Sequence, residues 1–381
     1  MSANQLVSCL GQCWRVLDQS GQPLGDRWCN LLIWGDNLPV LQHLAECPEV
    51  CGRVRLIYID PPFATNQDFL YDGQRAATVS RPQRGLLAYS DKFAREPYLH
   101  FLKQRLVLLR ELLAEDGSIY VHIDCKIGHY VKVLMDEIFG AENFINDITR
   151  IKCNPKNFSR RAYGNIKDMI LFYAKTPSYL WNDPREPWKE EDLARLFPKC
   201  DAQGRRYTTT PLHAPGETRC GATGQAWRNR LPPPGRHWRY PPEELERLDR
   251  AGLIEWSASG NPRKIVYAQD VLKRGKKRQD VWVYKDPPFP RYPTEKNLDL
   301  LKTIILASSN PGDLVLDGFV GSGTALVAAE ILGRRWIGID SSWPAIQVAQ
   351  RRLHELPPST PFALVQLPQP SNNLGPHQKG T

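Results

Sequence analysis

Short apolar runs alternate with segments of helical periodicity in both terminal thirds of this 381-residue chain. Early in the sequence, Leu31–Trp34 and Val54–Ile59 predict strands, and Leu38–Leu44 predicts the helix between them. Near the end, Leu314–Leu316 and Trp336–Ile339 are strand-like, with a helical pattern after each. Strand–helix alternation favours an α/β fold, namely a doubly wound, Rossmann-like and mostly parallel sheet with helices on both faces.

The other predicted elements fit the same alternation. Gly117 is expected to end a helical region that begins at Tyr98. The additional helices are expected at Tyr98–Leu113, Ile127–Phe139, Thr324–Leu332 and Pro344–Leu353, and the additional strands at Ser118–Ile123 and Ile170–Tyr173.

The middle third interrupts the alternation. It is rich in Pro, Gly and Arg, holds six of the eleven tryptophans, and shows one clear helical pattern, Pro242–Ala251. We therefore expect an insertion with its own small core. The predicted division is an N-terminal extension (1–27), the first half of the main domain (28–175), the insertion (176–285), the second half (286–356) and a disordered, Pro-, Asn- and Gly-rich tail (357–381).

Positive charge is concentrated in the same region. Residues 150–285 hold 28 Lys and Arg against 15 Asp and Glu, whereas the rest of the chain holds 22 against 26. Such a local excess favours a polyanionic partner, with a solvated basic surface as the alternative.

Composition also excludes several protein classes. No segment has the roughly 18 uninterrupted apolar residues that a membrane helix needs, and the N-terminus lacks a secretory pattern. The nine cysteines are irregularly spaced without a Cys-x-x-Cys pair, which argues against a disulfide framework and a zinc site. We expect a cytoplasmic protein with reduced thiols, no metal site and no membrane partner.

A glycine-containing segment follows the late strand-like run: Asp317-Gly318-Phe319-Val320-Gly321-Ser322-Gly323-Thr324. Its glycines permit a tight turn pressed against a ligand at a helix N-terminus. Asp340 ends the next strand, where a carboxylate suits the ribose hydroxyls of a nucleoside. A dinucleotide motif would place a third glycine where Leu326 stands, and a Walker lysine is absent. A nucleoside cofactor without phosphate, such as S-adenosylmethionine, fits this shorter turn.

The run Asp60-Pro61-Pro62-Phe63 directly follows the strand Val54–Ile59. A carboxylate and a prolyl carbonyl can accept hydrogen bonds from an exocyclic amine, which frees its lone pair, and Phe63 offers a face on which a base can stack. The alternative is a Pro-rich turn. A second copy, Asp286-Pro287-Pro288-Phe289, is separated from its β-like run, Val281–Tyr284, by Lys285. We interpret that copy as a linker away from the sheet edge, and Asp60 as the functional aspartate.

The two motifs above and three further fragments resemble the DNA amino-methyltransferases. The order of all five resembles the β class, in which the catalytic half precedes the recognition domain. The similarity covers about residues 28–355. The matching fragments are Gly35-Asp36-Asn37-Leu38, Tyr58 to Phe63, His122-Ile123-Asp124, Tyr292-Pro293-Thr294-Glu295-Lys296 and Asp317 to Thr324. The resemblance implies a seven-stranded sheet with one antiparallel strand and S-adenosylmethionine as cofactor. Phe63 and Gly318 depart from the commoner Tyr and Pro of the family.

The resemblance also implies roles for individual residues. Asp60, Pro61, Pro62 and Phe63 would be catalytic. Asp36 would lie beside the adenosyl group of the cofactor, and it could also cap the N-terminus of the predicted helix Leu38–Leu44. Asp124 would either support the site or cap a helix. The residues expected to bind the cofactor are Asp36, Thr294, Lys296, Asp317, Phe319, Gly321, Ser322, Gly323, Thr324 and Asp340.

Residues 222–280 resemble a segment found in part of the family, most distinctively at Pro232 to Tyr240 with Trp227-Arg228. Arginines suit phosphates and guanine edges, whereas core packing is the favoured role of the tryptophans. The residues expected to contact DNA are Arg228, Arg236, His237, Arg239, Lys273, Arg274, Lys276, Lys277 and Arg278.

These observations predict a site-specific methyltransferase that acts on adenine N6 in double-stranded DNA. Cytosine N4 is the nearest competing target. The aspartate that begins Asp60-Pro61-Pro62-Phe63 favours adenine N6, since the resembling cytosine N4 enzymes more often begin the motif with Ser. An RNA or protein-glutamine N-methyltransferase and an inactive DNA-binding module are two less favoured functions. A second copy of the chain and a cognate restriction endonuclease are further partners left open by the resemblance.

Overall fold

The computed structural model describes residues 29–63, 68–71, 86–90, 94–155, 161–273, 275–357 and 362–366. The chain divides into two compact units. Met1–Asp183 and Gln279–Thr381 form the first unit, and Pro184–Arg278 forms the second. The second unit lies within the range 176–285 expected for an insertion. No helix among the described residues is long and apolar enough to cross a membrane.

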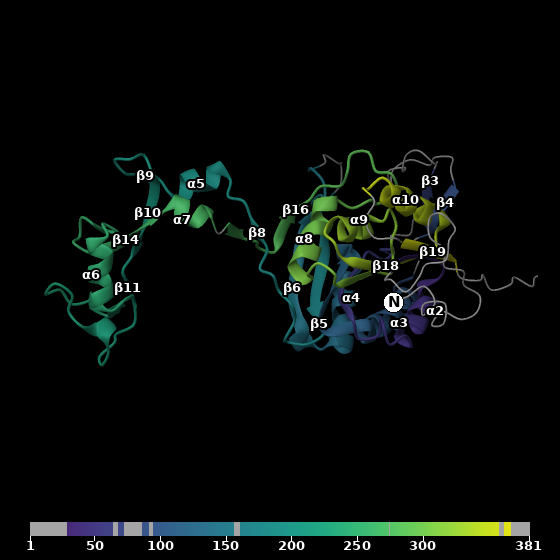
Figure 1. Ribbon diagram of the computed structural model, residues 1–381, viewed down its shortest axis with the longest axis horizontal. Coiled ribbons are helices and arrows are strands. Elements are labelled where there is room, and N and C mark those ends of the chain that lie inside the picture. Colours follow the sequence, from purple (N-terminus) through teal and green to yellow (C-terminus); the bar gives the residue numbers. More distant parts are fainter. Residues whose placement is uncertain are drawn as a thin grey trace, which may run out of the picture. The chain divides into compact units, whose positions relative to one another are not determined.

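A nine-stranded sheet organises the first unit (Figure 1). Every neighbouring pair is parallel except the two that involve β7, which runs antiparallel to both of its neighbours. The strand order is β16 (Val281–Val283), β6 (Phe144–Ile151), β7 (Lys167–Ala174), β5 (Leu113–Ile123), β2 (Val54–Ile59), β17 (Leu314–Asp317), β18 (Arg335–Asp340), β1 (Asn30–Trp34) and β19 (Phe362–Gln366).

The doubly wound α/β fold and the single antiparallel strand are thus confirmed, but the expected count of seven strands is wrong. The short strands β16 and β19 extend the sheet at its two edges. β19 forms within the tail that was expected to be disordered, because Phe362 and Val365 are buried and the strand pairs in parallel with β1. Apart from Pro357 and β19, the tail lies outside the described residues.

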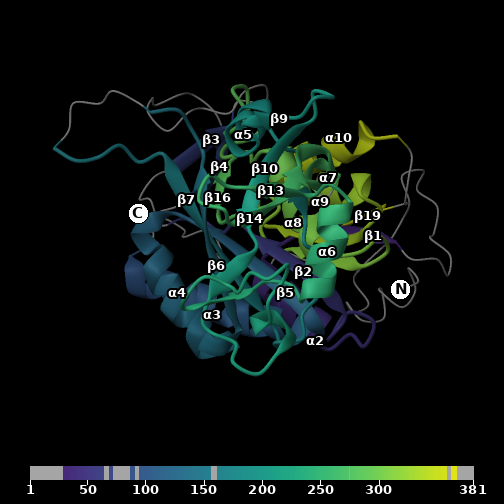
Figure 2. The same cartoon turned by 90° about the vertical axis from the view of Figure 1, so that its left-hand side faces the viewer.

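Helices cover both faces of this sheet (Figures 1 and 2). One apolar core lies under α2 (Asn37–Ala45), α3 (Arg95–Leu112) and α4 (Cys125–Phe139). The other lies under α8 (Leu298–Ser308), α9 (Thr324–Ile331) and α10 (Trp343–His354). Successive residues of β1 enter different cores, Leu31 and Ile33 the first and Leu32 the second, as the alternation of side chains along a strand requires.

The strand β6 was not predicted, and two further details of the first unit differ from the predictions. Gly117 lies inside β5 and does not end a helix, since α3 stops at Leu112. A Cβ on Gly117 would lie 2.9 Å from the carbonyl oxygens of Ala114 and Val54, so the glycine permits a close approach of β5 to β2. Helix α8 was not predicted because it is apolar nearly all round, which hides the helical period. A hairpin, β3 (Asp68–Tyr71) and β4 (Leu86–Ser90), completes the unit.

The second unit is built from short elements around two small cores. Trp227 and Trp238 are buried with Leu212, Leu245 and Leu248, which confirms the predicted packing role of these tryptophans. The helix expected at Pro242–Ala251 is α6 (Pro242–Arg250), and two short helices, α5 (Glu190–Leu196) and α7 (Ala268–Leu272), were not predicted. The strands are β13 (Ile254–Trp256), β14 (Pro262–Tyr267), β10 (Arg206–Pro211) and β9 (Lys199–Cys200) in one sheet, β11 (His213–Pro215) with β12 (Arg236–Trp238), and β8 (Arg185–Glu186) with β15 (Lys276–Lys277).

Candidate active site

A cavity of about 630 Å³ lies in the first unit, where the parallel strands β1, β2, β17 and β18 end. The loops that follow these strands form its walls, as is usual for ligand sites in open α/β sheets. All predicted catalytic and cofactor-binding residues except Gly323 line it: Asp36, Asp60, Pro61, Pro62, Phe63, Thr294, Lys296, Asp317, Phe319, Gly321, Ser322, Thr324 and Asp340.

Asp60 stands directly after β2 on one wall of the cavity. One of its carboxylate oxygens, Oδ2, accepts a hydrogen bond from the Lys296 ammonium. The other, Oδ1, is buried and has no hydrogen-bond partner among the described residues. A buried carboxylate oxygen left without a donor is costly, so this atom is available to a donor that enters the cavity.

Two glycines in the turn between β17 and α9 are needed for different structural reasons. Gly321 has φ +51° and donates its N–H to Asp340 Oδ2 at 2.8 Å. Gly323 has φ +77° at the start of α9, and a Cβ there would lie 2.7 Å from the Cβ of Ala349 in α10. Gly323 therefore serves the contact between two helices and does not line the cavity.

Asp340 ends β18 and faces the cavity beside this turn. Its two oxygens each accept one backbone N–H, from Gly321 and from Ser342, both at 2.8 Å. A carboxylate oxygen can accept two hydrogen bonds, so each still has capacity for a ligand hydroxyl. Burial raises the pKa of Asp340 to about 6, despite the opposing backbone donors.

A second buried carboxylate, Asp317, lies at the end of the adjacent strand. It accepts the Phe319 N–H at 2.9 Å, which shapes the first part of the glycine turn. Burial raises the pKa of Asp317 well above its ordinary value, and the nearby Asp60 and Asp340 carboxylates raise it further.

Asp36 lines the cavity and caps α2, where it accepts the Leu38 N–H at 2.9 Å, so the N-cap role is confirmed and the cofactor role stays a prediction. Its Oδ1 also receives the buried Arg105 guanidinium at 2.9 Å. Arg105 contacts Asn37, whose side-chain amide donates to the Gly318 carbonyl at 2.7 Å. Sequence reasoning missed Arg105, which joins α3 to the glycine turn through Asn37.

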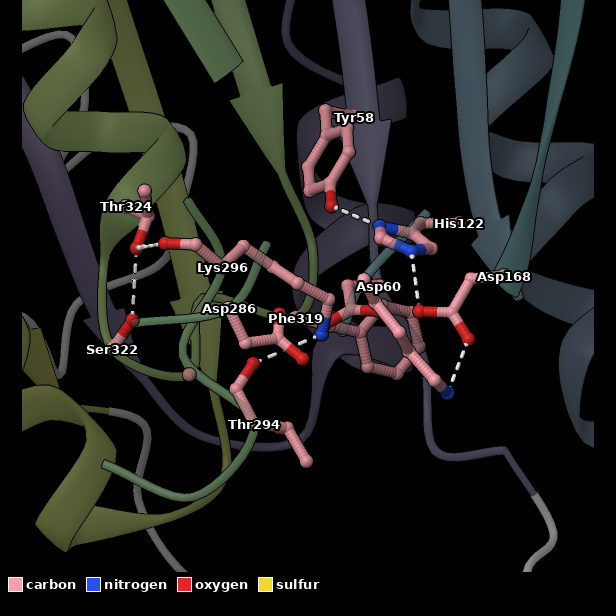
Figure 3. A network of polar contacts seen from close by, with 12 residues as sticks. Tyr58, Asp60, His122, Asp168, Asp286, Thr294, Lys296, Phe319, Ser322 and Thr324 are labelled. Atoms are coloured by element: carbon pink, nitrogen blue, oxygen red, sulfur yellow. Dashed lines mark hydrogen bonds and ion pairs between the residues drawn. The ribbon is translucent and has the colours of Figure 1, made fainter. Parts of the chain in front are cut away.

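A chain of buried polar side chains lies behind the Asp60 loop and was also missed (Figure 3). Burial raises the pKa of Tyr58 and lowers that of His122, although Asp168 acts in the opposite direction on His122. In a neutral imidazole, the nitrogen that faces a carboxylate must carry the proton, because an ionised carboxylate only accepts. His122 Nε2–H thus donates to Asp168 at 3.2 Å, and His122 Nδ1 accepts the Tyr58 hydroxyl at 2.9 Å. Lys152 contacts the same carboxylate at 2.6 Å.

These hydrogen bonds fix the orientation of the His122 imidazole, which is fully buried in β5. The ring centroids of His122 and Phe63 are 6.2 Å apart, so the imidazole supports the aromatic wall of the cavity. The sequence signals were Tyr58 and His122, each in a family-like fragment, but nothing in the sequence links His122 to Asp168. Asp124, from the same fragment, caps α4 by accepting the Lys126 N–H at 2.8 Å.

The second Asp-Pro-Pro-Phe copy is not a linker away from the sheet, and that interpretation is wrong. Its preceding run forms the edge strand β16, which pairs with β6. Asp286 receives the guanidinium of fully buried Arg150, and its N–H donates to the Lys152 carbonyl at 2.8 Å. The fourth residue, Phe289, is 78% exposed. Asp286 is therefore a counterion for a core arginine and does not line the cavity.

The residues predicted to contact DNA all lie in the second unit, within Pro184–Arg278. Arg236 and Arg239 are exposed on and beside β12, and His237 lies between them. Arg228 is held by Glu246 and Asp249 at 2.9 and 2.6 Å. Lys276 and Arg278 lie near acidic side chains, Lys273 and Lys277 are exposed, and Arg274 lies outside the described residues.

A family model and two relatives match this chain. A family model described as DNA methylase (N6_N4_Mtase) matches residues 54–351. The type II methyltransferase M.EcaI of Enterobacter cloacae is 45% identical over 330 residues, which cover 85% of this chain and 69% of M.EcaI. The StyLTI Mod subunit, a type III restriction-modification enzyme of Salmonella typhimurium, is 27% identical over 339 residues, or 80% of this chain and 50% of that protein.

Among solved structures, the complex of M1.HpyAVI with S-adenosylmethionine has a TM-score of 0.44 and 18% identity. The match covers 86% of this chain and all of M1.HpyAVI.

Proposed function

Because the chain belongs to the N6/N4 DNA methylase family, we propose that it transfers a methyl group from S-adenosylmethionine to the exocyclic N6 of adenine. The target base would be flipped out of duplex DNA into the cavity, since an enzyme cannot reach this amine within a base-paired stack. A cognate restriction endonuclease would recognise the same site, as the restriction-modification relatives suggest.

The observation on which this proposal rests is the state of Asp60. Its Oδ2 is occupied by Lys296, and its buried Oδ1 has no donor among the described residues. An aromatic amine is a poor nucleophile because its lone pair is delocalised into the ring. A hydrogen bond from the amine to Oδ1 would localise that lone pair on nitrogen and orient it for attack.

Phe63 and the two prolines would hold the base while this bond forms. Phe63 presents its ring to the cavity beside Asp60, where a flipped base can stack. Pro61 and Pro62 restrict the loop, because each proline fixes φ and limits the residue before it. The prolyl carbonyls supply further acceptors for the second amine hydrogen.

The residues on the opposite wall fit S-adenosylmethionine. Asp340 retains acceptor capacity for the two ribose hydroxyls, and the turn at Gly321 brings backbone close to the cavity. The 630 Å³ volume is within the range of small-molecule sites. When bound, this cofactor supplies an electrophilic methyl group on its sulfonium.

The second unit would position the DNA. Arg236 and Arg239 are exposed near His213, and the pKa of His213 is lowered by its burial and by these arginines together with Arg263. Burial is the larger cause of the lowered pKa, and the arginines add to it. Exposed positive charge of this kind attracts phosphates.

The test is methyl transfer from labelled S-adenosylmethionine to unmethylated genomic DNA, followed by nucleoside analysis. We expect N6-methyladenine from wild type, and at least about 100-fold less from Asp60→Ala, the scale for losing one preorganised polar group at a reacting centre. Asp299→Ala is the matched control, because Asp299 is an exposed aspartate in the first turn of α8 outside the cavity.

Different products would contradict different parts of the proposal. N4-methylcytosine would replace adenine by cytosine as the target. No transfer to DNA by protein that binds S-adenosylmethionine would reject the DNA substrate and favour RNA or protein. Equal activity of Asp60→Ala and wild type would reject the assigned site.

A further inference from the structure

The ammonium of Lys296 is buried among three groups, two of which belong to the Asp60 loop. It contacts Asp60 Oδ2, donates to the Thr294 carbonyl at 2.9 Å, and lies 5.5 Å from the centroid of the Phe63 ring. The side chain is only 8% exposed. A buried lysine requires partners of this kind. Figure 3 shows the Lys296 ammonium beside Asp60 and Thr294. Lys296 thus lies against both side chains, Asp60 and Phe63, to which the proposed function assigns the binding of the target base.

The backbone next to Lys296 is strained in a way that supports this arrangement. Thr294 has φ +59°, a left-handed conformation that β-branched residues rarely adopt. Such conformations persist where the surrounding structure imposes them, and they cluster at functional sites. Here the left-handed turn at Thr294 accompanies a carbonyl that faces the Lys296 ammonium.

The segment around Lys296 is also anchored to the glycine turn. Glu295 accepts the Arg291 N–H at 2.6 Å and pairs with buried Arg352 at 3.2 Å. Arg352 in turn donates to the Ser322 carbonyl at 2.8 Å. The cofactor wall and the Asp60 wall are therefore joined through the segment 291–296, with Lys296 as the residue that reaches across to Asp60.

We propose that Lys296 is a positioning residue for methyl transfer, which holds Asp60 by Oδ2 so that Oδ1 alone is presented to the target amine. A carboxylate can rotate about its Cβ–Cγ bond unless one oxygen is held. The ion pair fixes this rotation, and the contact with Phe63 fixes the ring against which the base stacks. This inference rests on the proposed amine methylation and deepens it.

The competing role is that Lys296 only binds the cofactor, as the family resemblance implies. The two roles predict different kinetic defects. A cofactor-binding lysine would affect mainly the affinity for S-adenosylmethionine, whereas a positioning lysine would affect mainly kcat. A displacement of about 1 Å at a reacting group costs on the order of 100-fold in rate.

The experiment compares wild type with Lys296→Met, which keeps the length of the side chain but removes its charge. Lys302→Met is the control, because Lys302 is a partly exposed lysine of α8 that pairs with Asp299 outside the cavity. Single-turnover methylation of duplex DNA gives the rate, calorimetry gives the affinity for S-adenosylmethionine, and thermal unfolding reports folding. We expect Lys296→Met to lose about 100-fold in rate with cofactor affinity within about threefold of wild type.

Chemical rescue separates positioning from a general structural role. Lys296→Ala removes three carbons and the ammonium, which n-propylammonium can replace. Added n-propylammonium should restore activity to Lys296→Ala in a saturable manner and leave Lys296→Met and wild type unchanged.

The outcomes distinguish this inference from the proposed function. Wild-type protein that fails to methylate any DNA amine would reject the proposed function. Wild-type activity with an unimpaired Lys296→Met variant, or with a defect confined to cofactor affinity, would reject only the positioning role. Absence of rescue in folded Lys296→Ala would also count against it.

Discussion

Asp340 shows how burial changes the pKa of a single carboxylate in the cavity. Its pKa is raised from 3.8 to about 6 by burial, although Gly321 and Ser342 donate to it. Between these pH values the folded protein retains a proton that the unfolded chain has lost. The contribution of Asp340 to stability therefore decreases as pH rises from about 4 to about 6.

Hydroxyls of a bound ligand should lower the raised pKa of Asp340 again, because hydrogen bonds donated to a carboxylate favour its ionised form. We expect S-adenosylmethionine to bind with proton release near pH 6, and its affinity to fall as pH decreases below 6, by up to tenfold per pH unit. Calorimetry in buffers of different ionisation enthalpy measures the released protons. Asp340→Asn should abolish this release, and equal affinity of wild type at pH 5 and 7.5 would contradict the assignment of Asp340 to the ribose.

At the scale of elements, the glycine turn depends on the packing of α9 against α10. A Cβ at Gly323 would overlap Ala349. An alanine there would also have to adopt φ +77°, which is unfavourable for a residue with a side chain. We expect Gly323→Ala to lower the free energy of unfolding by about 3 kcal/mol, which combines left-handed strain with overpacking.

Gly312→Ala is the matched control for this substitution. Gly312 has φ +84°, but a Cβ there would have nothing within 4 Å, so only the conformational cost of about 1 kcal/mol remains. Urea unfolding measures both variants. An equal loss in the two would show that the contact with Ala349 is unimportant.

The ion pair between Arg150 and Asp286 joins the segment just after the edge strand β16 to β6. Arg150 is fully buried and Asp286 is 44% exposed, so their ion pair is shielded on the arginine side. Asp286→Ala would leave the buried guanidinium with the 3.5 Å contact to Asp168 as its remaining ion pair. We expect a loss of about 2 kcal/mol in unfolding free energy, less than for a fully unpaired buried charge.

The comparison for Asp286→Ala is Asp299→Ala, whose carboxylate is exposed and makes only a 3.8 Å pair with Lys302. Exposed pairs contribute at most about 1 kcal/mol. Similar urea midpoints for the two variants would restore the interpretation of residues 286–289 as a linker. Because Asp286 supports the core, its substitution is a stability test and is unsuitable as a silent control for activity.

At the scale of the whole molecule, the basic second unit is expected to govern DNA affinity independently of cofactor binding. Arg236 and Arg239 are exposed, whereas Arg228 is neutralised by Glu246 and Asp249. Arg236→Gln with Arg239→Gln should weaken DNA binding and reduce the slope of log K against log salt by about 2, or about 0.9 per phosphate contact.

Arg228→Gln is the control for the DNA-binding prediction. A DNA contact was expected of Arg228 from the sequence, but its ion pairs with Glu246 and Asp249 favour a structural role, so this substitution should lower stability and leave the salt slope unchanged. Fluorescence anisotropy across a salt series gives the slopes, and calorimetry should show unaltered affinity for S-adenosylmethionine in all three proteins. An unchanged slope in the double variant would place the phosphate contacts elsewhere.

Much of the fold was predictable from local pattern. The apolar runs Val54–Ile59 and Trp336–Ile339 coincide with β2 and the inner part of β18. Asp60, Asp317 and Asp340 each come at the end of a predicted strand, and they line one cavity because parallel strands place their carboxyl ends at one edge of a sheet. The residues were found because each directly follows a recognisable strand.

Other features required contacts between distant segments. Lys296 and Asp60 are 236 residues apart, and His122 and Asp168 lie on two strands whose antiparallel pairing no local pattern reveals. The strand β19 forms only because β1 offers an edge with which Phe362–Gln366 can pair. Periodicity, turn chemistry and strand ends are properties of neighbouring residues, so the sequence by itself determined the α/β class and the position of the site. The tertiary structure alone decided the edge strands and the partners of Asp60, His122 and Asp286, because hydrogen bonds and ion pairs depend on distances that folding creates.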